Sequence, residues 1–344
     1  MKNENKLKGK KILVTGGAGF IGSEVVRQLS SREARILVFD NFSSGRKKYV
    51  QNLPNVKLVK GDVSKKSQVQ KITKDVDYIL NLAALPFIPD SFFYPDEFFK
   101  VNTIGTINLI MASMKSKRLK RFVHISSSEI YGSAKKIPMS EDHPTLPHST
   151  YATSKLAAER AVYTLHKEHD FPAIIIRPFN SYGPRITQPY IIPEIITQFM
   201  KGSLSIKLGN VKSTRDFTYV SDTARAIIYS LTSKNSLGEA INVGSGNSIK
   251  IKDLAALIAK IMNKKFSIKI DKKRLRPYDV ENLICDNTKA RRLLKWKPLV
   301  SIEEGLTNTI NWMKANRTDF ITPFKGWPKA HRMKLVNWIS SGKY

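Results

Sequence analysis

Short apolar runs alternate with longer amphipathic stretches through the first half of this chain. The runs have the length and β-branched content of buried strands, and they fall at residues 11–14, 36–39, 56–59, 78–82, 122–125 and 173–176. The stretches between them have helical spacing, most clearly at residues 96–117 and 150–169. Apolar strands that alternate with helices predict a doubly wound parallel sheet that is covered by helices on both faces.

The pattern changes after about residue 178. Helical stretches there are separated by short strands and loops, and they lie at residues 193–201, 222–232, 251–262 and 302–314. We therefore expect a first domain over residues 1–178 and a smaller α/β lobe over residues 179–344, from which a strand or a helix can return to the first domain. A substrate is expected in the cleft between them, beyond the carboxyl ends of the strands.

A glycine-rich turn follows the first predicted strand and opens a helix at Phe20 and Ile21. Gly16, Gly19 and Gly22 keep the spacing G-x-x-G-x-x-G. The first glycine permits a tight turn, the second lets a pyrophosphate approach the backbone, and the third lets the helix pack against the strand. Free N–H groups at the helix start would then face an anionic ligand. This pattern predicts a Rossmann dinucleotide-binding domain, with a ligand-free glycine turn as the alternative.

An acidic residue, Asp40, stands at the end of the second predicted strand. A carboxylate at this place accepts hydrogen bonds from the adenosine ribose hydroxyls and repels a 2′-phosphate. The sequence therefore favours NAD over NADP as the cofactor. Arg46 is close in sequence and could weaken that preference.

The composition fits a cytoplasmic globular protein. The 344 residues are 41% hydrophobic, enough for one large or two modest domains with a proper core. No run of about 18 apolar residues occurs, so no membrane span is expected, and the lysine-rich residues 1–11 do not have the pattern of a secretory signal. The single cysteine, Cys285, excludes an internal disulfide and is expected to be a small buried hydrophobe.

The charge balance is strongly basic, with a formal net charge of +30. A field of this sign attracts anionic ligands, nucleic acid or an acidic membrane surface. The lysines are scattered and no nucleic-acid motif accompanies them, so specific nucleic-acid binding is not expected. The basic, tryptophan-containing tail at residues 327–338 could lie on a membrane or cap the domain, and we favour the cap.

Tyr151 and Lys155 are four residues apart in a predicted helix and therefore share one face. An ammonium near a phenol is expected to lower the phenol pKa, because the cation favours the phenolate. The tyrosine can then take a proton from a sugar hydroxyl as a hydride leaves for a nicotinamide.

Several motifs occur in the order typical of one family: TGGAGFIG (15–22), DN (40–41), GDV (61–63), NLAA (81–84), NTIGT (102–106), SSSEIYG (126–132), YATSK (151–155), RPFNSYGPR (177–185) and RDFTYV (215–220). With them, residues from about 10 to about 316 resemble the extended short-chain dehydrogenase/reductase family of nucleotide-sugar epimerases, dehydratases and decarboxylases. The resemblance implies bound NAD, a nucleotide-diphosphate sugar as substrate, and a homodimer that packs through the helices at residues 96–117 and 150–169.

The resemblance also implies binding roles on both sides of the expected cleft. Besides the glycine turn, Asp40, Tyr151 and Lys155, cofactor contacts are implied for Asn41, Asp62, Val63, Leu82, Ala83, Ala84, Asn102 and Pro178. Substrate contacts are implied for Ser91, Asn180, Arg185, Arg215 and Arg276. A guanidinium suits phosphate oxygens, and surface ion pairing is the alternative for Arg215 and Arg276.

The segment after the fifth predicted strand carries Ser127, Ser128 and Glu129. A 4-epimerase needs only hydride transfer out and back, whereas a 4,6-dehydratase needs a base for the C5 proton, and Glu129 has the right chemistry. Its alternative is a carboxylate that binds turn amides. Glucose-type dehydratases resemble Thr-Asp-Glu here, so this chain lacks their acidic residue for the leaving hydroxyl, and Ser127 and Ser128 are expected to orient the C4 oxygen and assist at C6. A Ser-Glu pair is also similar to mannose-type dehydratases and glucuronate decarboxylases.

Two further stretches, at residues 82–92 and 192–217, look like the substrate loops of dehydratases that act on nucleotide-linked N-acetylhexosamines, and residues 274–277 add to this likeness. The leading hypothesis is therefore an NAD-dependent nucleotide-sugar 4,6-dehydratase. A 4-epimerase, a nucleotide-glucuronate decarboxylase, and a binding protein without turnover remain the alternatives. No metal site is expected because the six histidines are dispersed, and His124 is expected to be a satisfied core histidine.

Overall fold

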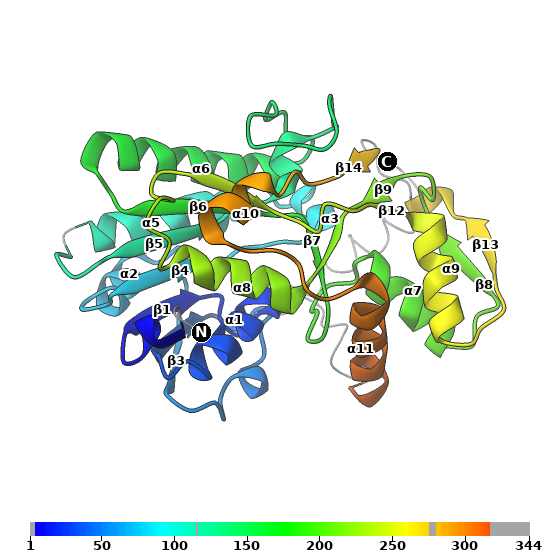
Figure 1. The fold of residues 1–344 in the computed structure, drawn as a ribbon, viewed down its shortest axis with the longest axis horizontal. Coiled ribbons are helices and arrows are strands. Elements are labelled where there is room, and N and C mark those ends of the chain that lie inside the picture. The colour runs from blue at the N-terminus through cyan, green and yellow to red at the C-terminus, as the bar shows by residue number, and fades with distance from the viewer. Residues whose placement is uncertain (1–3, 115, 275–279, 317–344) are drawn as a thin grey trace.

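A seven-stranded parallel sheet forms the centre of the computed structural model, which describes residues 4–114, 116–274 and 280–316 (Figure 1). The strand order is β11-β6-β5-β4-β1-β2-β3, and every neighbouring pair is parallel. The strands are β1 (Lys11–Thr15), β2 (Arg35–Asp40), β3 (Val56–Lys60), β4 (Tyr78–Asn81), β5 (Arg121–Ile125), β6 (Ala173–Pro178) and β11 (Ala240–Val243). The doubly wound parallel sheet expected from the apolar runs is confirmed.

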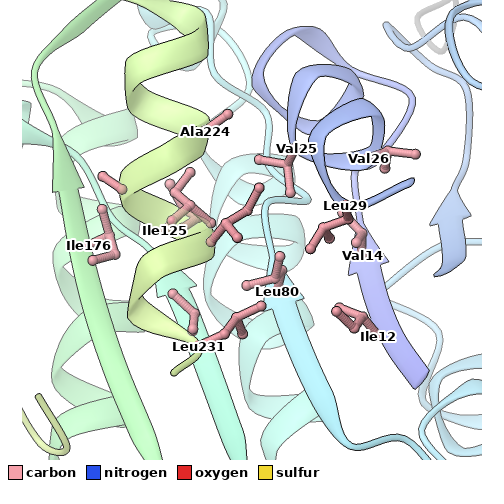
Figure 2. Packing of buried hydrophobic residues seen from close by; sticks show 14 of the residues in the cluster. Ile12, Val14, Val25, Val26, Leu29, Leu80, Ile125, Ile176, Ala224 and Leu231 are labelled. Atoms are coloured by element: carbon pink, nitrogen blue, oxygen red, sulfur yellow. The ribbon is translucent and has the colours of Figure 1, made fainter. Parts of the chain in front are cut away.

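Helices cover both faces of the sheet because successive strand residues point to opposite sides. Ile12 and Val14 pack with the helices of one face, whereas Leu13 between them joins the core of the other face. Figure 2 shows the first core, in which Val25 and Leu29 meet residues of a later helix. That face carries α1 (Phe20–Ser30), α8 (Val220–Ser230) and α10 (Thr288–Leu294), and the other carries α2 (Lys66–Ile72), α5 (Gly105–Ser113) and α6 (Thr150–His169).

The long helix expected at residues 96–117 is built from three consecutive segments. They are α4 (Pro95–Phe98), a π-helical turn η3 (Phe99–Ile104) and α5. At the junction the Thr106 hydroxyl donates to the Asn102 carbonyl oxygen at 2.7 Å, so a side chain uses an acceptor of the helix backbone. Such local changes of helical register are common near functional sites.

A smaller lobe adjoins the seven-stranded sheet and its helices, and it has its own apolar core. Its helices are α7 (Ile191–Met200), α9 (Ile251–Ile261) and α11 (Ile302–Ala315). Its short strands pair as β7 (Asn180–Tyr182) with β10 (Phe217–Tyr219), β8 (Ser205–Leu208) with β13 (Ser267–Ile270), and β9 (Thr214–Arg215) with β12 (Ile249–Lys250) and β14 (Asn282–Leu283). Short helices complete the described chain: η1 (Glu4–Leu7), η2 (Lys47–Tyr49), α3 (Ile88–Ser91), η4 (Ser128–Tyr131) and η5 (Lys272–Arg274).

The two lobes are interleaved in sequence. Helix α8 comes after residue 178, yet it packs on the seven-stranded sheet (Figure 1). Strand β11 also comes after residue 178, and it forms the edge strand of that sheet beside β6. Within the described residues, no helix is both long and apolar enough to span a bilayer. The tail at residues 327–338, for which a cap and a membrane contact were considered, lies outside the described residues.

Candidate active site

A cavity of about 470 Å³ opens at the carboxyl ends of the sheet strands. One wall contains the glycine-rich turn after β1 and the residues that follow β2, β3, β4 and β5, together with the first turns of α6. The opposite wall comes from the smaller lobe and includes residues of α7, β8 and β9. Both lobes therefore line one cavity at the place where doubly wound folds bind ligands.

The glycine-rich turn forms a close backbone cradle at the floor of this cavity. Gly16 has a φ of +67°, and a Cβ built there would lie 2.8 Å from the backbone nitrogen of Ala83. A Cβ on Gly22 would lie 2.1 Å from the Gly16 carbonyl oxygen. Helix α1 starts directly after Gly19, and no described side chain caps it. Its first backbone N–H groups therefore remain as donors for an anion, which is the arrangement that a dinucleotide pyrophosphate requires.

The Asp40 carboxylate joins this turn to the end of β2. Its two oxygens accept hydrogen bonds from the backbone N–H groups of Ala18, at 2.9 Å, and Phe42, at 2.7 Å. Burial raises the pKa of this carboxyl group, and these two hydrogen bonds oppose the shift. Asp40 also lines the cavity, with Asn41, Asp62 and Val63 beside it. The residue expected to recognise ribose thus has a second task, because it holds the glycine-rich turn in place.

Tyr151 and Lys155 lie in the first two turns of α6 and both line the cavity. The Lys155 ammonium donates a hydrogen bond to the carbonyl oxygen of Ile125, and burial lowers its pKa to about 8. The pKa of Tyr151 is raised to about 12: burial raises it most, a hydrogen bond with the Ser127 side chain lowers it, and the charge of Glu129 raises it. The expectation that the Tyr151 pKa is lowered is therefore wrong, because the effect of burial is larger than that of the polar contacts.

Ser127, Ser128 and Glu129 lie at the start of η4, directly after β5. The Ser127 hydroxyl oxygen caps this short helix by accepting a hydrogen bond from the Glu129 backbone N–H at 3.2 Å. All three residues line the cavity. Since the Glu129 charge acts on the Tyr151 phenol, the structure brings together the candidate base, the candidate proton acceptor and the lysine that sequence reasoning selected separately.

The remaining expected cofactor residues divide into two groups. Leu82, Ala83, Ala84 and Pro178 line the cavity, as do the glycine-turn residues Gly16, Gly19, Phe20, Ile21 and Gly22. Asn102 does not, because it is fully buried behind the wall. Its amide accepts from the Leu85 N–H at 2.8 Å and donates to the Ser154 hydroxyl at 2.9 Å. It therefore fixes the loop after β4 against α6.

The expected substrate residues divide in the same way. Asn180 and Arg215 line the cavity, and Arg215 also donates to the Thr214 carbonyl oxygen at 2.9 Å. Ser91 is fully buried and donates to the Ile88 carbonyl oxygen, so it does not reach the cavity. Arg185 is paired with Glu24 and does not line the cavity either. Arg276 lies outside the described residues.

Some cavity residues were given no site role by sequence reasoning, although they lie in or beside stretches that it selected. Lys207 on β8 and Arg274 on η5 add basic side chains to the wall of the smaller lobe. Arg274 forms an ion pair with Glu194 at 2.9 Å. Phe87 and Tyr190 form an aromatic wall, with ring centroids 6.1 Å apart. Only the pattern of apolar and basic residues in these stretches pointed to them, and which side chains face inward depends on tertiary packing.

His124 lies in β5 and is completely buried, within reach of the charge of Lys155 on α6. Its Nδ1 lies 3.3 Å from the Asn81 side-chain nitrogen, whereas its Nε2 has no hydrogen-bond partner in the described part of the chain. Burial and the Lys155 charge hold its pKa well below the usual range. The expectation of a satisfied core histidine is thus half met. Among the described residues, no group of three or more histidine, cysteine, aspartate or glutamate side chains could hold a metal ion.

Comparisons with known proteins find relatives that are similar over most of the chain. Residues 13–309 match the sequence profile of the family described as GDP-mannose 4,6 dehydratase. The chain is 32% identical to a putative UDP-glucose 4-epimerase of Methanocaldococcus jannaschii, over 89% of this chain and 99% of that protein. It is also 32% identical to a UDP-N-acetyl-alpha-D-glucosaminuronate decarboxylase of Bacillus cytotoxicus, over 90% and 99%. Among solved structures, a dTDP-glucose 4,6-dehydratase of Bacillus anthracis in complex with NAD is similar, with a TM-score of 0.81 and 30% identity over 90% of this chain and 98% of that chain.

Proposed function

This chain belongs to the GDP-mannose 4,6 dehydratase family, whose homologues are NAD-dependent nucleotide-sugar dehydratases, epimerases and decarboxylases of the extended short-chain dehydrogenase/reductase family, and we propose that it is a nucleotide-sugar 4,6-dehydratase. One observation supports a dehydratase over a 4-epimerase, and the mass of the product separates the dehydratase from a decarboxylase, which shares the Ser-Glu pair. Glu129 and Tyr151 line the same cavity, and the charge of Glu129 raises the pKa of the Tyr151 phenol, which supports Glu129 as a base that acts on the same sugar ring.

The residues of the cavity fit NAD. The cradle at Gly16 and Gly22 leaves no room for a Cβ, and the open start of α1 supplies backbone donors for the pyrophosphate. Asp40 places a carboxylate where an NADP phosphate would be repelled. When bound here, NAD supplies the hydride acceptor for the sugar C4 and the hydride that returns to C6.

Tyr151 and Lys155 handle the C4 hydroxyl proton. The Tyr151 oxygen accepts this proton as the C4–H bond breaks, and the Lys155 ammonium favours the phenolate form. A phenol with a pKa of about 12 needs positive charge close by in order to ionise near neutral pH. Lys155 provides that charge from the same face of α6 only while it is protonated, which its pKa of about 8 allows.

Glu129 performs the step that separates a dehydratase from an epimerase. Once C4 is a carbonyl, the C5 proton is acidic, and the Glu129 carboxylate removes it. The C6–O bond then breaks and the oxygen leaves as water, with its second proton from Glu129 or from water because serine is a poor acid. Ser127 and Ser128 orient the C4 oxygen and assist at C6. A proton from solvent returns to C5, and Tyr151 releases the C4 hydroxyl proton to solvent because the product keeps its C4 carbonyl, which completes the balance.

Positive side chains support a nucleotide-diphosphate group as the other half of the substrate. Arg215, Lys207 and Arg274 lie on the wall of the smaller lobe, and Asn180 adds a side-chain amide. Guanidinium groups bind phosphate oxygens through paired hydrogen bonds. The apolar wall of Phe87 and Tyr190 suits a sugar ring with an apolar substituent, such as the N-acetyl group that the loop sequences suggested.

The alternative activities use the same cavity. A 4-epimerase needs Tyr151 and Lys155 but no carboxylate at Glu129, and a glucuronate decarboxylase loses carbon dioxide after the same C4 oxidation. A binding protein without turnover would keep the glycine cradle and does not require the three side chains together. Tyr151, Lys155 and Glu129 all line one cavity, so we propose the dehydratase first, and the epimerase and the decarboxylase after it.

A panel of nucleotide sugars tests this function. The purified protein is incubated with UDP-N-acetylglucosamine, UDP-glucose, dTDP-glucose, GDP-mannose and UDP-glucuronic acid, and the products are analysed by mass spectrometry. The proposal expects loss of one water from at least one of them. An unchanged mass with sugar interconversion, a loss of carbon dioxide, or no turnover of any of them would each contradict it.

We also propose a homodimer and a cytoplasmic location. Large apolar side chains are exposed on the outer surface of the helices of one face, including Phe99, Ile104, Met111 and Tyr163 on η3, α5 and α6. A partner copy that packs α5 and α6 against its own would cover them, and sedimentation velocity would give the mass of the assembly. The free, buried Cys285 fits a reducing compartment.

A further inference from the structure

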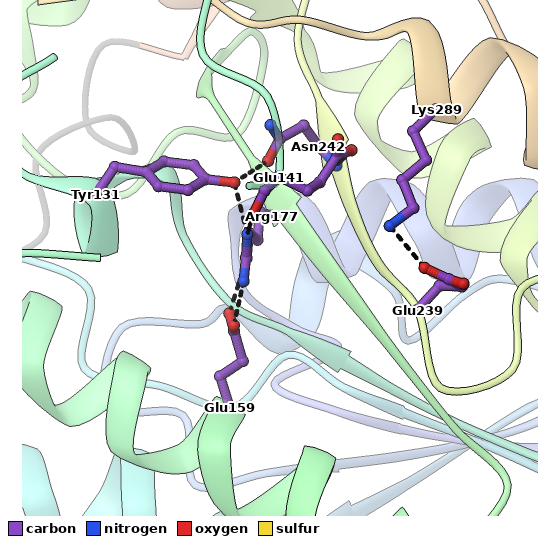
Figure 3. Close-up of polar contacts among 7 residues, drawn as sticks. All are labelled: Tyr131, Glu141, Glu159, Arg177, Glu239, Asn242 and Lys289. Carbon is purple, nitrogen blue, oxygen red and sulfur yellow. Dashed lines mark hydrogen bonds and ion pairs between the residues drawn. The ribbon is translucent and has the colours of Figure 1, made fainter. Parts of the chain in front are cut away.

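A buried ionic network lies beside the active-site helix α6 (Figure 3). Arg177 of β6 and Glu159 of α6 have side chains that are only 5% and 1% exposed. The Arg177 Nη2 donates to one carboxylate oxygen of Glu159 at 2.5 Å, and its Nε donates to the other at 3.1 Å. This forked contact uses the fixed geometry of the guanidinium and holds the two side chains in one orientation.

The third nitrogen of the same guanidinium reaches a different part of the chain. The Arg177 Nη1 donates to the Tyr131 hydroxyl oxygen at 2.6 Å and to the Glu141 carbonyl oxygen at 3.1 Å. The Tyr131 hydroxyl in turn donates to the Asn242 side-chain oxygen at 2.6 Å, and the Asn242 amide donates to the Met139 carbonyl oxygen at 3.0 Å. Arg177 thus connects α6 with η4, with β11 and with the loop that follows η4 (Figure 3).

The network joins the helix that holds Tyr151 and Lys155 to the short helix that holds Glu129. Glu159 follows Lys155 by one helical turn and Tyr151 by two, so the three side chains share one face of α6. Tyr131 ends the short helix η4 and stands two residues after Glu129. The distance between the Glu129 carboxylate and the Tyr151 phenol therefore depends on how α6 and η4 are joined, and Arg177 joins them directly.

We propose that Arg177, Glu159 and Tyr131 are positioning residues that set the place of the Glu129 base relative to Tyr151 and Lys155. The network touches neither cavity nor substrate, since none of the three lines the cavity. A buried ion pair is weak grounds for added stability, because removing two charges from water offsets most of their attraction. The network instead fixes the orientation of its side chains through directional hydrogen bonds. A lysine at position 177 could not make the forked contact with Glu159.

This inference rests on the proposed dehydratase function and makes a separate prediction about it. In C4 oxidation the proton is taken by Tyr151 of α6, and Ser127 and Ser128 only orient the oxygen, whereas proton removal at C5 is carried out by Glu129 of η4 and depends directly on where η4 is held. Loosening the link between them slows the second step more than the first, because displacing a catalytic group by about 1 Å can cost about 100-fold in rate. A network that only stabilises the fold would slow both steps together, in proportion to the folded fraction.

The variant Tyr131→Phe tests the link with little change of shape. It keeps the aromatic ring, its contact with the Arg177 guanidinium at 5.1 Å and the Arg177–Glu159 pair, and it removes only the hydroxyl that bridges Arg177 and Asn242. Arg177→Lys is the second variant, which keeps the charge and loses the fork. The matched control is Lys289→Gln, which breaks the neighbouring ion pair with Glu239, at 2.6 Å, and removes no hydrogen bond of the network (Figure 3).

Each protein, with its cofactor bound, is mixed with the nucleotide sugar from the panel that the wild type converts fastest. Two quantities are followed: absorbance of the reduced nicotinamide, and deuterium uptake at C5 from heavy water. We expect Tyr131→Phe and Arg177→Lys to reduce deuterium uptake by at least about 10-fold while the reduced cofactor still forms and accumulates. The control should match the wild type in both quantities.

Equal slowing of both quantities, or no change in either, would overturn the positioning role. Thermal melting of each variant separates a loss of folded protein from a change in the ratio of the two steps. The wild-type result is judged on its own: a wild type that removes no water from any sugar of the panel contradicts the proposed function, and the positioning role then falls with it. A wild type that removes water beside variants with an unchanged ratio contradicts the positioning role alone.

Discussion

The Lys155 ammonium donates a hydrogen bond to the carbonyl oxygen of Ile125, the last residue of β5. This contact ties the active-site helix to the strand that leads directly into Ser127 and Glu129. Lysine rarely lies in so buried a place, and burial lowers its pKa from 10.5 to about 8. The buried ammonium therefore reduces the stability of the fold while it places a positive charge in the wall of the cavity.

Replacing Lys155 by methionine should abolish turnover while leaving the fold at least as stable near neutral pH. A lysine pKa lowered from 10.5 to about 8 corresponds to on the order of 3 kcal/mol of destabilisation, present in full below pH 8. Between pH 8 and 10.5 the unfolded chain binds more protons at this site than the folded one, so the wild type gains stability relative to the variant as the pH rises. Chemical denaturation of both proteins at neutral pH and near pH 10 measures the difference. A difference that does not depend on pH would show that Lys155 is not buried as a cation.

Replacing Glu129 by glutamine should stop water loss and still permit C4 oxidation. The amide keeps the shape of the side chain and cannot accept the C5 proton, so we expect turnover to fall by about 100- to 10,000-fold. Absorbance of the reduced nicotinamide after mixing with substrate reports the first step, and product mass reports the second. Glu168→Gln, an exposed change at the far end of α6, is the control and should behave as the wild type does. Full turnover by Glu129→Gln would assign the base to another group.

Replacing Gly22 by alanine should remove the cofactor from the purified protein. The added Cβ would lie 2.1 Å from the Gly16 carbonyl oxygen, so the turn or the start of α1 has to move. Gly202→Asn is the control, because no atom lies within 4 Å of a Cβ at that position and asparagine tolerates its φ of +81°. The NAD content after purification and the shift in melting temperature on adding NAD measure the effect. Wild-type NAD content in Gly22→Ala would contradict the proposed place of the pyrophosphate.

Replacing Asp40 by asparagine should narrow the preference for NAD over NADP. The change removes the charge that repels a 2′-phosphate, and we expect the ratio of the two affinities to fall by about 10-fold or more. The variant also weakens the contact with the Ala18 N–H, so affinity for NAD itself should fall. Titration calorimetry with both cofactors gives the ratio. An unchanged ratio would mean that Asp40 only holds the turn.

The sequence was most informative where the chemistry depends on local spacing. Gly16 and Gly22 act through the backbone of a single turn, and Tyr151 and Lys155 share a helix face because they are four residues apart. Their place in the cavity followed from the strand and helix pattern alone. The strand and helix pattern predicted a parallel sheet. It did not predict that β11 returns to this sheet, because that depends on pairing with β6 more than sixty residues earlier.

Side chains whose direction depends on distant partners could not be predicted in the same way. Arg185 follows the expected motif, yet it turns toward Glu24 on α1. Ser91 binds the backbone of its own turn, and Asn102 binds Leu85 and Ser154 behind the cavity wall. Lys207 reaches the cavity because β8 pairs with β13 about sixty residues later. Neither local spacing nor residue type carries this information.

The most direct test of the proposed activity is the product mass when the wild type acts on the nucleotide sugars of the panel in heavy water. A 4,6-dehydratase whose carboxylate exchanges the C5 proton with solvent should give a product that has lost one water and gained one carbon-bound deuterium at C5. A product of unchanged mass without deuterium, or one that has lost carbon dioxide, would contradict the account.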